Sequence, residues 1–217
     1  ETGKLVQGSD IVIPQGTGVR GIADIFRREN IIQEPLVFLL GVRIAGLDRS
    51  LRAGEYHFPA RVSPKQAAEI LAAGDTVKRF VTIPEGLRSS EIVARINLVD
   101  GLTGEISDIP PDGMLLPETY QFSFGDTKQS IIDRMAAAHD ALVAQLWPGR
   151  EANLPFDTID EAIVLASIVE RETGIAAERP RVAGVFVNRL RMNMRLQSDP
   201  TVAYAISPDE PLDRALT

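Results

Sequence analysis

Two glutamates, Glu170 and Glu172, close an otherwise apolar segment, "AIVLASIVERETG", which runs from Ala162 to Gly174. A carboxylate near the C-terminus of a helix faces the negative end of the helix dipole, which disfavours its charged form. Partial burial of Glu170 against Ala166 and Ile163, one and two turns earlier, acts in the same direction, so both effects predict a raised pKa. A carboxylic acid that keeps its proton near neutral pH can act as a general acid, which makes Glu170 a candidate catalytic residue.

Glu172 is not equivalent to Glu170, because its side chain points about 200° away by the helical period. It is expected to reach solvent or Arg171. A structural role for Glu170 also stays open at this point. In that alternative its carboxylate pairs with Arg171, with Arg195 or with a nearby amide.

The elements that must position these carboxylates have clear sequence signals. Thr158 and Glu161 fit a capping box, and Gly174 is predicted to supply a left-handed stop. The pattern therefore predicts a helix over about 159–173. Apolar residues surround its whole circumference, so we expect this helix to lie inside its domain.

Another amphipathic helix is predicted in "ERPRVAGVFVNRLRMN", which begins at Glu178. Its apolar face consists of Val182, Val185, Phe186 and Leu190. Asn188 projects from a different face. In "QSDPTVAYAI", which follows, Asp199 is expected to cap a helix whose first residue is Pro200.

The N-terminal part predicts strand, helix, helix and strand near 10–14, 18–29, 35–45 and 54–58. This β-α-α-β order resembles a LysM-type glycan-binding module. We predict an α+β fold, with a LysM-like domain over residues 1–75 and a mixed α+β domain over residues 76–217.

A weak internal repeat runs along the chain. Ile13-Pro14-x-Gly16 matches Ile83-Pro84-x-Gly86, and "GEYHF" (54–58) matches "ETYQF" (118–122). Each copy reads as a strand, a proline-glycine turn, a helix, a variable middle, an aromatic strand and a further helix. "GTGVRG" (16–21) also fits a dinucleotide fingerprint, but the second copy keeps only its first glycine, so no nucleotide cofactor is predicted.

Composition excludes several other functions. The 23 basic and 30 acidic residues give a net charge of −7, which argues against a general nucleic-acid binder. The absence of cysteine and the presence of only two histidines, His57 and His139, argue against a histidine- or cysteine-rich metal site, and no metal site is predicted. The sequence contains no run of 18 or more apolar residues, so it predicts no membrane span.

The segment "ASIVERETG", followed by "ERPRVAGVFVNRLRMNMRLQSDPTVAY" (178–204), resembles the endolytic murein transglycosylase family (MltG, also called YceG-like). "IPEG" (83–86) and "DGMLLPETYQF" (112–122) carry the same resemblance. It implies a lytic transglycosylase that cuts nascent peptidoglycan between N-acetylmuramic acid and N-acetylglucosamine. The family's catalytic glutamate falls on Glu170.

The resemblance also implies where the substrate binds. "FVNRL" (186–190) and "LQSDPT" (196–201) would line the site, with Asn188, Gln197 and Ser198 as hydrogen-bond donors to the sugar. The complete set of expected substrate-binding residues is Asn188, Gln197, Ser198, Asp199, Arg189, Glu118 and Tyr120.

Family resemblance further implies a single-pass protein of the bacterial inner membrane, with this portion on the periplasmic side and an N-terminal membrane helix that this sequence lacks. Peptidoglycan strands and peptidoglycan synthases are the implied partners. In the family the catalytic domain continues beyond the point at which this chain stops, so we expect it to be incomplete at its C-terminal end.

Two alternatives stay open at the level of sequence. The first is a non-catalytic peptidoglycan-binding protein in which the LysM-like part carries the affinity. The second is a glycoside hydrolase with two carboxylates, in which Glu170 works with Glu118 or Asp199.

Overall fold

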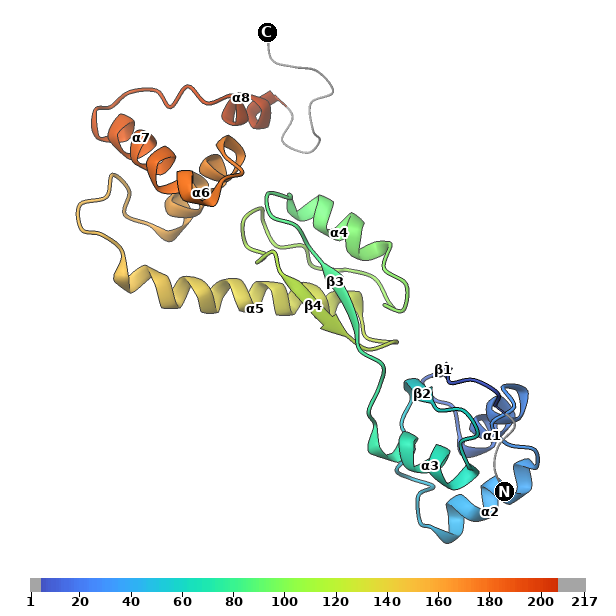
Figure 1. Cartoon of the computed structure of the whole chain (residues 1–217). Coiled ribbons are helices and arrows are strands. Elements are labelled where there is room, and N and C mark those ends of the chain that lie inside the picture. The colour runs from blue at the N-terminus through green and yellow to red at the C-terminus, as the bar shows by residue number, and fades with distance from the viewer. Residues whose placement is uncertain (1–4, 207–217) are drawn as a thin grey trace. The chain divides into compact units, whose positions relative to one another are not determined.

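The computed structural model of the chain describes residues 5–206, which fall into two compact units (Figure 1). Up to Val81 the chain belongs to the first unit, together with Val99–Glu105 and Tyr120–Lys128. The second unit consists of Thr82–Leu98, Ile106–Thr119 and the chain from Gln129 onward. These units reflect compactness rather than independent folding, so the domain division at residues 75 and 76 stays a prediction.

The first unit contains the predicted β-α-α-β order. Its elements are β1 (Ser9–Ile13), α1 (Val19–Arg28), α2 (Pro35–Ile44), β2 (Gly54–Phe58) and α3 (Pro64–Ala73). Strands β1 and β2 pair antiparallel, with Ser9 opposite Phe58 and Ile13 opposite Gly54. The order is confirmed, and the likeness to a LysM module stays a prediction.

Aromatic packing forms the centre of the first unit's core. The Phe26 ring on α1 meets the Phe38 ring on α2 at a centroid distance of 5.3 Å and the Phe58 ring on β2 at 5.2 Å, both edge to face. All three side chains are almost completely buried. Edge-to-face contacts of this kind add to the stabilisation from burial, so these rings tie both helices to the sheet.

A partly buried ion pair joins β2 to Arg79 within the first unit. Glu55 on β2 is only 6% exposed, and its carboxylate accepts hydrogen bonds from Arg79 Nε at 2.7 Å and Nη2 at 2.9 Å. This two-point contact raises the pKa of Arg79. A buried carboxylate needs such a partner, because an isolated charge in the core is strongly destabilising.

The other elements are β3 (Arg79–Thr82), α4 (Ser89–Asn97), β4 (Thr119–Phe122), α5 (Lys128–Leu146), α6 (Ile159–Glu172), α7 (Arg179–Arg191) and α8 (Asp199–Ile206), with short 3-10 turns at Trp147–Gly149 and Ala176–Glu178. Strand β3 pairs with β4 in a second two-stranded sheet. The α+β class is therefore confirmed.

The structure reproduces the internal repeat. In each copy a strand is followed by an Ile-Pro-x-Gly turn and a helix, α1 or α4, and a later strand pairs with the first and leads to α3 or α5. Gly16 and Gly86, the repeated glycines, have the same left-handed backbone, each with φ of 77°. Glycine adopts this conformation without the steric cost that a side chain brings, which explains why the turn keeps it.

Helix α6 does not lie inside the protein as its composition predicts. Leu165, Ile168 and Val169 are buried and pack with Phe186 of α7. Val164 is 59% exposed, and Ala166 is also exposed. Among residues 5–206, α7 covers only one face of α6. The prediction that α6 is buried all round was therefore wrong for the opposite face. No helix in this described range is both long and apolar enough to cross a membrane.

Candidate active site

The predicted capping box starts helix α6 and sets its register. Thr158 Oγ1 accepts a hydrogen bond from the Glu161 amide at 3.3 Å. Glu161 Oε2 in turn accepts the amides of Thr158 at 3.1 Å and Asp157 at 3.0 Å. Satisfying amides that have no partner inside the helix stabilises this end, so the start of α6 is confirmed.

The capping box predicts a pH dependence, because its hydrogen bonds from the Asp157 and Thr158 amides hold the pKa of Glu161 below its ordinary value. A lowered pKa in the folded state stabilises the fold above the unfolded-state pKa, and that stabilisation is lost as the pH falls through the folded-state pKa. Carbon-13 NMR titration of the Glu161 carboxyl is expected to show this lowered pKa. Thr158→Ala removes the Thr158 hydroxyl, which also donates to Glu161 Oε2 at 3.0 Å and lowers the pKa, so this variant is expected to move the pKa upward; an unchanged value would contradict the assignment.

Helix α6 ends at Glu172, as predicted within one residue, but not by the predicted device. Thr173 follows in an extended conformation, with φ of −146° and ψ of 128°. Gly174 is not among the left-handed glycines, so the stop assigned to it was wrong. The Thr173 hydroxyl instead donates to Glu178 at 3.0 Å and accepts the Ile175 amide, which folds the connection back towards α7.

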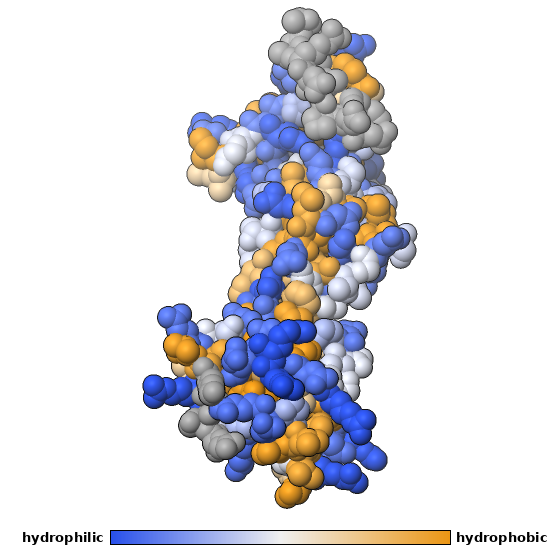
Figure 2. All heavy atoms as spheres, turned by 90° about the vertical axis from the view of Figure 1, so that its right-hand side faces the viewer, coloured by the Kyte–Doolittle hydropathy of each residue, from blue (hydrophilic) through white to orange (hydrophobic). Residues whose placement is uncertain are grey.

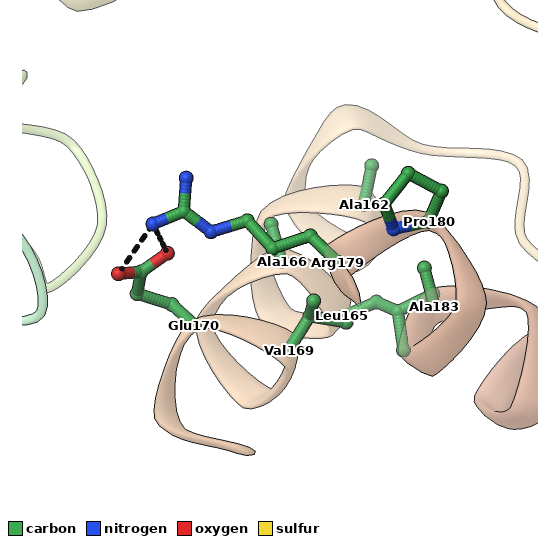
Figure 3. Close-up of a pocket in the computed structure, with 8 residues that line it drawn as sticks. All are labelled: Ala162, Leu165, Ala166, Val169, Glu170, Arg179, Pro180 and Ala183. Atoms are coloured by element: carbon green, nitrogen blue, oxygen red, sulfur yellow. Dashed lines mark hydrogen bonds and ion pairs between the residues drawn. The ribbon is translucent and has the colours of Figure 1, made fainter. Parts of the chain in front are cut away.

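Glu170 and Arg179 meet because of this tight connection (Figure 3). The Nη2 atom of Arg179, the first residue of α7, lies 3.0 Å from Oε1 and 2.9 Å from Oε2 of Glu170. The side chain of Glu170 is 29% exposed, so its carboxylate stays partly accessible. The structure therefore gives Glu170 an arginine partner, but this partner is Arg179 and not Arg171 or Arg195.

Glu85 is a third charged residue at the same place. Arg179 Nη2 donates to Glu85 Oε2 at 3.0 Å, across 94 residues of sequence. Glu85 belongs to the Ile-Pro-Glu-Gly turn, and a Cβ atom added to Gly86 in that turn would lie 4.0 Å from Glu170 Cγ. The second copy of the repeat thus brings its turn against the end of α6.

Sequence reasoning missed Glu85 and Arg179 as site residues. A signal for Glu85 was present in the repeat, where the matching position of the first copy is Gln15. The turn is kept between the two copies but only the second has a carboxylate. For Arg179 the only signal was its place at the start of the helix that follows α6.

A pocket of about 410 Å³ lies between α6 and α7 and ends at this ion pair (Figure 3). Its lining is Ala162, Leu165, Ala166, Val169, Glu170, Arg179, Pro180 and Ala183. Small alanine side chains leave room along the pocket, and the only charged groups of the lining are Glu170 and Arg179. Mostly apolar pockets with a few polar groups at one place are typical ligand sites.

Ser198, in the loop before α8, contacts Glu172, the last residue of α6. Ser198 is 3% exposed, and its hydroxyl donates a short hydrogen bond to Glu172 Oε1. Glu172 therefore has a partner other than Arg171. The hydroxyl proton of Ser198 is used inside the protein, and the predicted contact of Ser198 with substrate stays a prediction.

Other predicted residues of this region lie on α7 and the loop after it. Asn188 is exposed on α7, and Gln197 is exposed with a left-handed φ of 51°. Arg189 Nη1 donates a short hydrogen bond to the Leu196 carbonyl, which holds the loop to the helix. Asp199 is exposed and is itself the first residue of α8, so the helix begins one residue earlier than predicted.

Glu118 and Tyr120 flank the start of β4. The side chain of Glu118 is exposed, while its carbonyl accepts the Ile83 amide at 3.0 Å. Tyr120 is 9% exposed and belongs to the first unit. Their roles in substrate binding stay predictions. Between residues 5 and 206 there is no cluster of three or more His, Cys, Asp or Glu side chains suited to a metal ion.

A protein family and two curated relatives match this chain. The YceG-like family model matches residues 11–216. The chain is 28% identical to the endolytic murein transglycosylase of Bacillus subtilis strain 168, over 90% of this chain and 62% of that protein. It is 27% identical to the endolytic murein transglycosylase of Streptococcus pneumoniae strain D39, over 89% of this chain and 42% of that protein.

A solved structure shares the fold. The crystal structure of a YceG-like protein from Listeria monocytogenes aligns with a TM-score of 0.50 and 25% identity, over 97% of this chain and 78% of that one. The chain spans less than two thirds of the length of the curated relatives it matches.

Proposed function

Because the chain belongs to the YceG-like family, we propose that it is the part of an endolytic murein transglycosylase that carries the catalytic glutamate. The proposed reaction cleaves the bond between N-acetylmuramic acid and N-acetylglucosamine within a glycan strand and leaves a 1,6-anhydro end. The observation that supports this most directly is Glu170, a partly accessible carboxyl group at the end of an apolar pocket. The names of the relatives support the substrate class.

The proposed chemistry needs one carboxyl group that acts first as an acid and then as a base. Glu170 first donates its proton to the glycosidic oxygen as the bond from C1 of the muramyl sugar breaks, and the departing N-acetylglucosamine gains a 4-hydroxyl group. The C6 hydroxyl of the muramyl sugar then bonds to C1, and its proton passes to the Glu170 carboxylate. Atoms and protons balance without water, and Glu170 ends in the protonated form in which it started.

Exclusion of water from C1 of the muramyl sugar favours this reaction over hydrolysis. The apolar lining of the pocket can exclude water in this way. Ala162, Ala166 and Ala183 provide an apolar surface beside Glu170, against which the apolar face of a sugar ring can lie. A sugar seated there would shield its C1 from solvent. A hydrolase would instead use a second carboxylate as base or nucleophile, and the ends that the enzyme leaves distinguish that reaction from the proposed one.

Family membership also suggests where the protein works. We propose the outer face of the bacterial inner membrane, with nascent glycan strands as substrate and peptidoglycan synthases as partners on the same strands. No cofactor is required by this chemistry. Fractionation of cells that express the full-length protein tests the location, and recovery in the cytosolic fraction would contradict it.

End-group chemistry tests the proposed function. Purified peptidoglycan is digested with the full-length protein, and the new ends are identified by mass spectrometry. We expect 1,6-anhydro-muramyl ends from cuts inside strands. Reducing muramyl ends would replace the proposal by hydrolysis, and binding to peptidoglycan without any new ends would leave only a glycan-binding protein.

A further inference from the structure

Arg179 makes an unusual connection, because a single nitrogen atom, Nη2, contacts two carboxylates from distant parts of the sequence. Glu170 comes from the end of α6 and Glu85 from the turn after β3. The Arg179 side chain is 34% exposed, and its Nε atom is buried without a hydrogen-bond partner among the described residues. The Nε end of the guanidinium is thus buried, while its Nη2 atom lies between the two carboxylates.

Such an arrangement bears on the two forms that Glu170 must adopt. A guanidinium beside Glu170 stabilises the carboxylate, which suits the second half of the reaction, in which Glu170 accepts a proton. The first half needs the protonated acid, and protonation removes the charge that Arg179 faces on Glu170. Glu85 supplies a second negative charge at 3.0 Å, so Arg179 keeps an anionic partner while Glu170 carries its proton.

We propose that Arg179 and Glu85 are positioning residues for Glu170, with Arg179 holding its carboxyl group at the end of the pocket and Glu85 limiting how strongly Arg179 favours the charged form. This inference rests on the proposed function, since it assigns the residues that let one carboxyl group alternate between acid and base. Neither residue needs to contact the reacting atoms. No proton moves to or from Arg179 or Glu85 in this scheme.

The charged groups around Glu170 determine which of its two forms, carboxylate or protonated acid, each substitution is expected to favour. Arg179 of α7 contacts both Glu170 and Glu85 of the turn after β3, and Arg88, further along that turn, lies over the Tyr204 ring at 5.3 Å. Removing the Glu85 charge leaves Arg179 to Glu170 alone and favours the carboxylate. Removing the Arg179 charge leaves two neighbouring carboxylates and favours the protonated acid.

Opposite shifts of the pH–rate profile test the inference in the full-length protein. With Glu85→Gln we expect the alkaline limb of the kcat profile for anhydro-end formation to move to lower pH. With Arg179→Gln we expect it to move to higher pH, with a fall in kcat of about 10- to 100-fold because the carboxyl group is no longer held. Arg179→Lys keeps the charge and is expected to restore the position of the limb in part.

Matched controls separate this inference from the proposed function and from misfolding. Glu151→Gln and Arg95→Gln remove the same charges at exposed positions and are expected to leave the profile unchanged. Circular dichroism melting shows whether each variant folds. If the unmodified protein forms no anhydro ends, the proposed function fails. If it forms them and the two variants shift the limb in the same direction or not at all, only the roles of Arg179 and Glu85 are overturned.

Discussion

Replacing Glu170 with glutamine is expected to lower the rate of anhydro-end formation by about 10²- to 10⁴-fold, which is the usual contribution of general acid–base catalysis. Glutamine keeps the size of the side chain and one oxygen that can accept from Arg179, but it cannot donate a proton to the glycosidic oxygen. Because Glu170 is proposed to act in both halves of the reaction, the loss is expected in kcat rather than in KM.

Glu172→Gln is the matched control, since it makes the same chemical change two residues further along α6. Glu172 accepts from Ser198 rather than from Arg179, so we expect a loss of less than about tenfold, through the Ser198 contact alone. Initial rates are measured on the same peptidoglycan, with end groups counted by mass spectrometry. Equal losses in the two variants would mean that the end of α6, and not the Glu170 carboxyl group, had been disturbed.

Local signals predicted the elements of this site well. The capping box at Thr158 and Glu161 placed the start of α6, and proline at the first turn of α7 is consistent with the start of that helix. Hydrogen bonds between residues three positions apart determine such features, so they can be read from a short stretch of sequence. The repeat likewise predicted a first strand and a later aromatic strand in each copy, and in the structure these two strands pair in both copies.

The partners of Glu170 could not be predicted in the same way. Arg179 reaches it because Thr173 ends α6 in an extended conformation, whereas the sequence favoured a left-handed stop at Gly174. Glu85 reaches the site through tertiary packing of a turn that is 94 residues from Arg179. Composition also predicted burial on every side of α6, but exposure depends on which neighbours are present, and Val164 has none that covers it among residues 5–206.

Phe26→Ala is expected to cause the largest loss of stability in the first unit. Phe26 is completely buried, and its ring contacts Phe38 on α2 and Phe58 on β2 at about 5 Å. Truncation removes this contact area and leaves a cavity between α1, α2 and the sheet. We expect the free energy of unfolding to fall by about 3–5 kcal/mol, measured by urea denaturation followed by far-UV circular dichroism.

Phe80→Ala makes the same change on β3, where the Phe80 side chain is 62% exposed, and should alter the free energy of unfolding by about 0.5 kcal/mol or less. The comparison measures burial directly, because both variants lose the same atoms from the same unit. Similar losses in the two variants would contradict the assignment of Phe26 to the core. A large loss confined to Phe26→Ala would show that the β-α-α-β unit depends on one aromatic cluster, which joins both of its helices to β2.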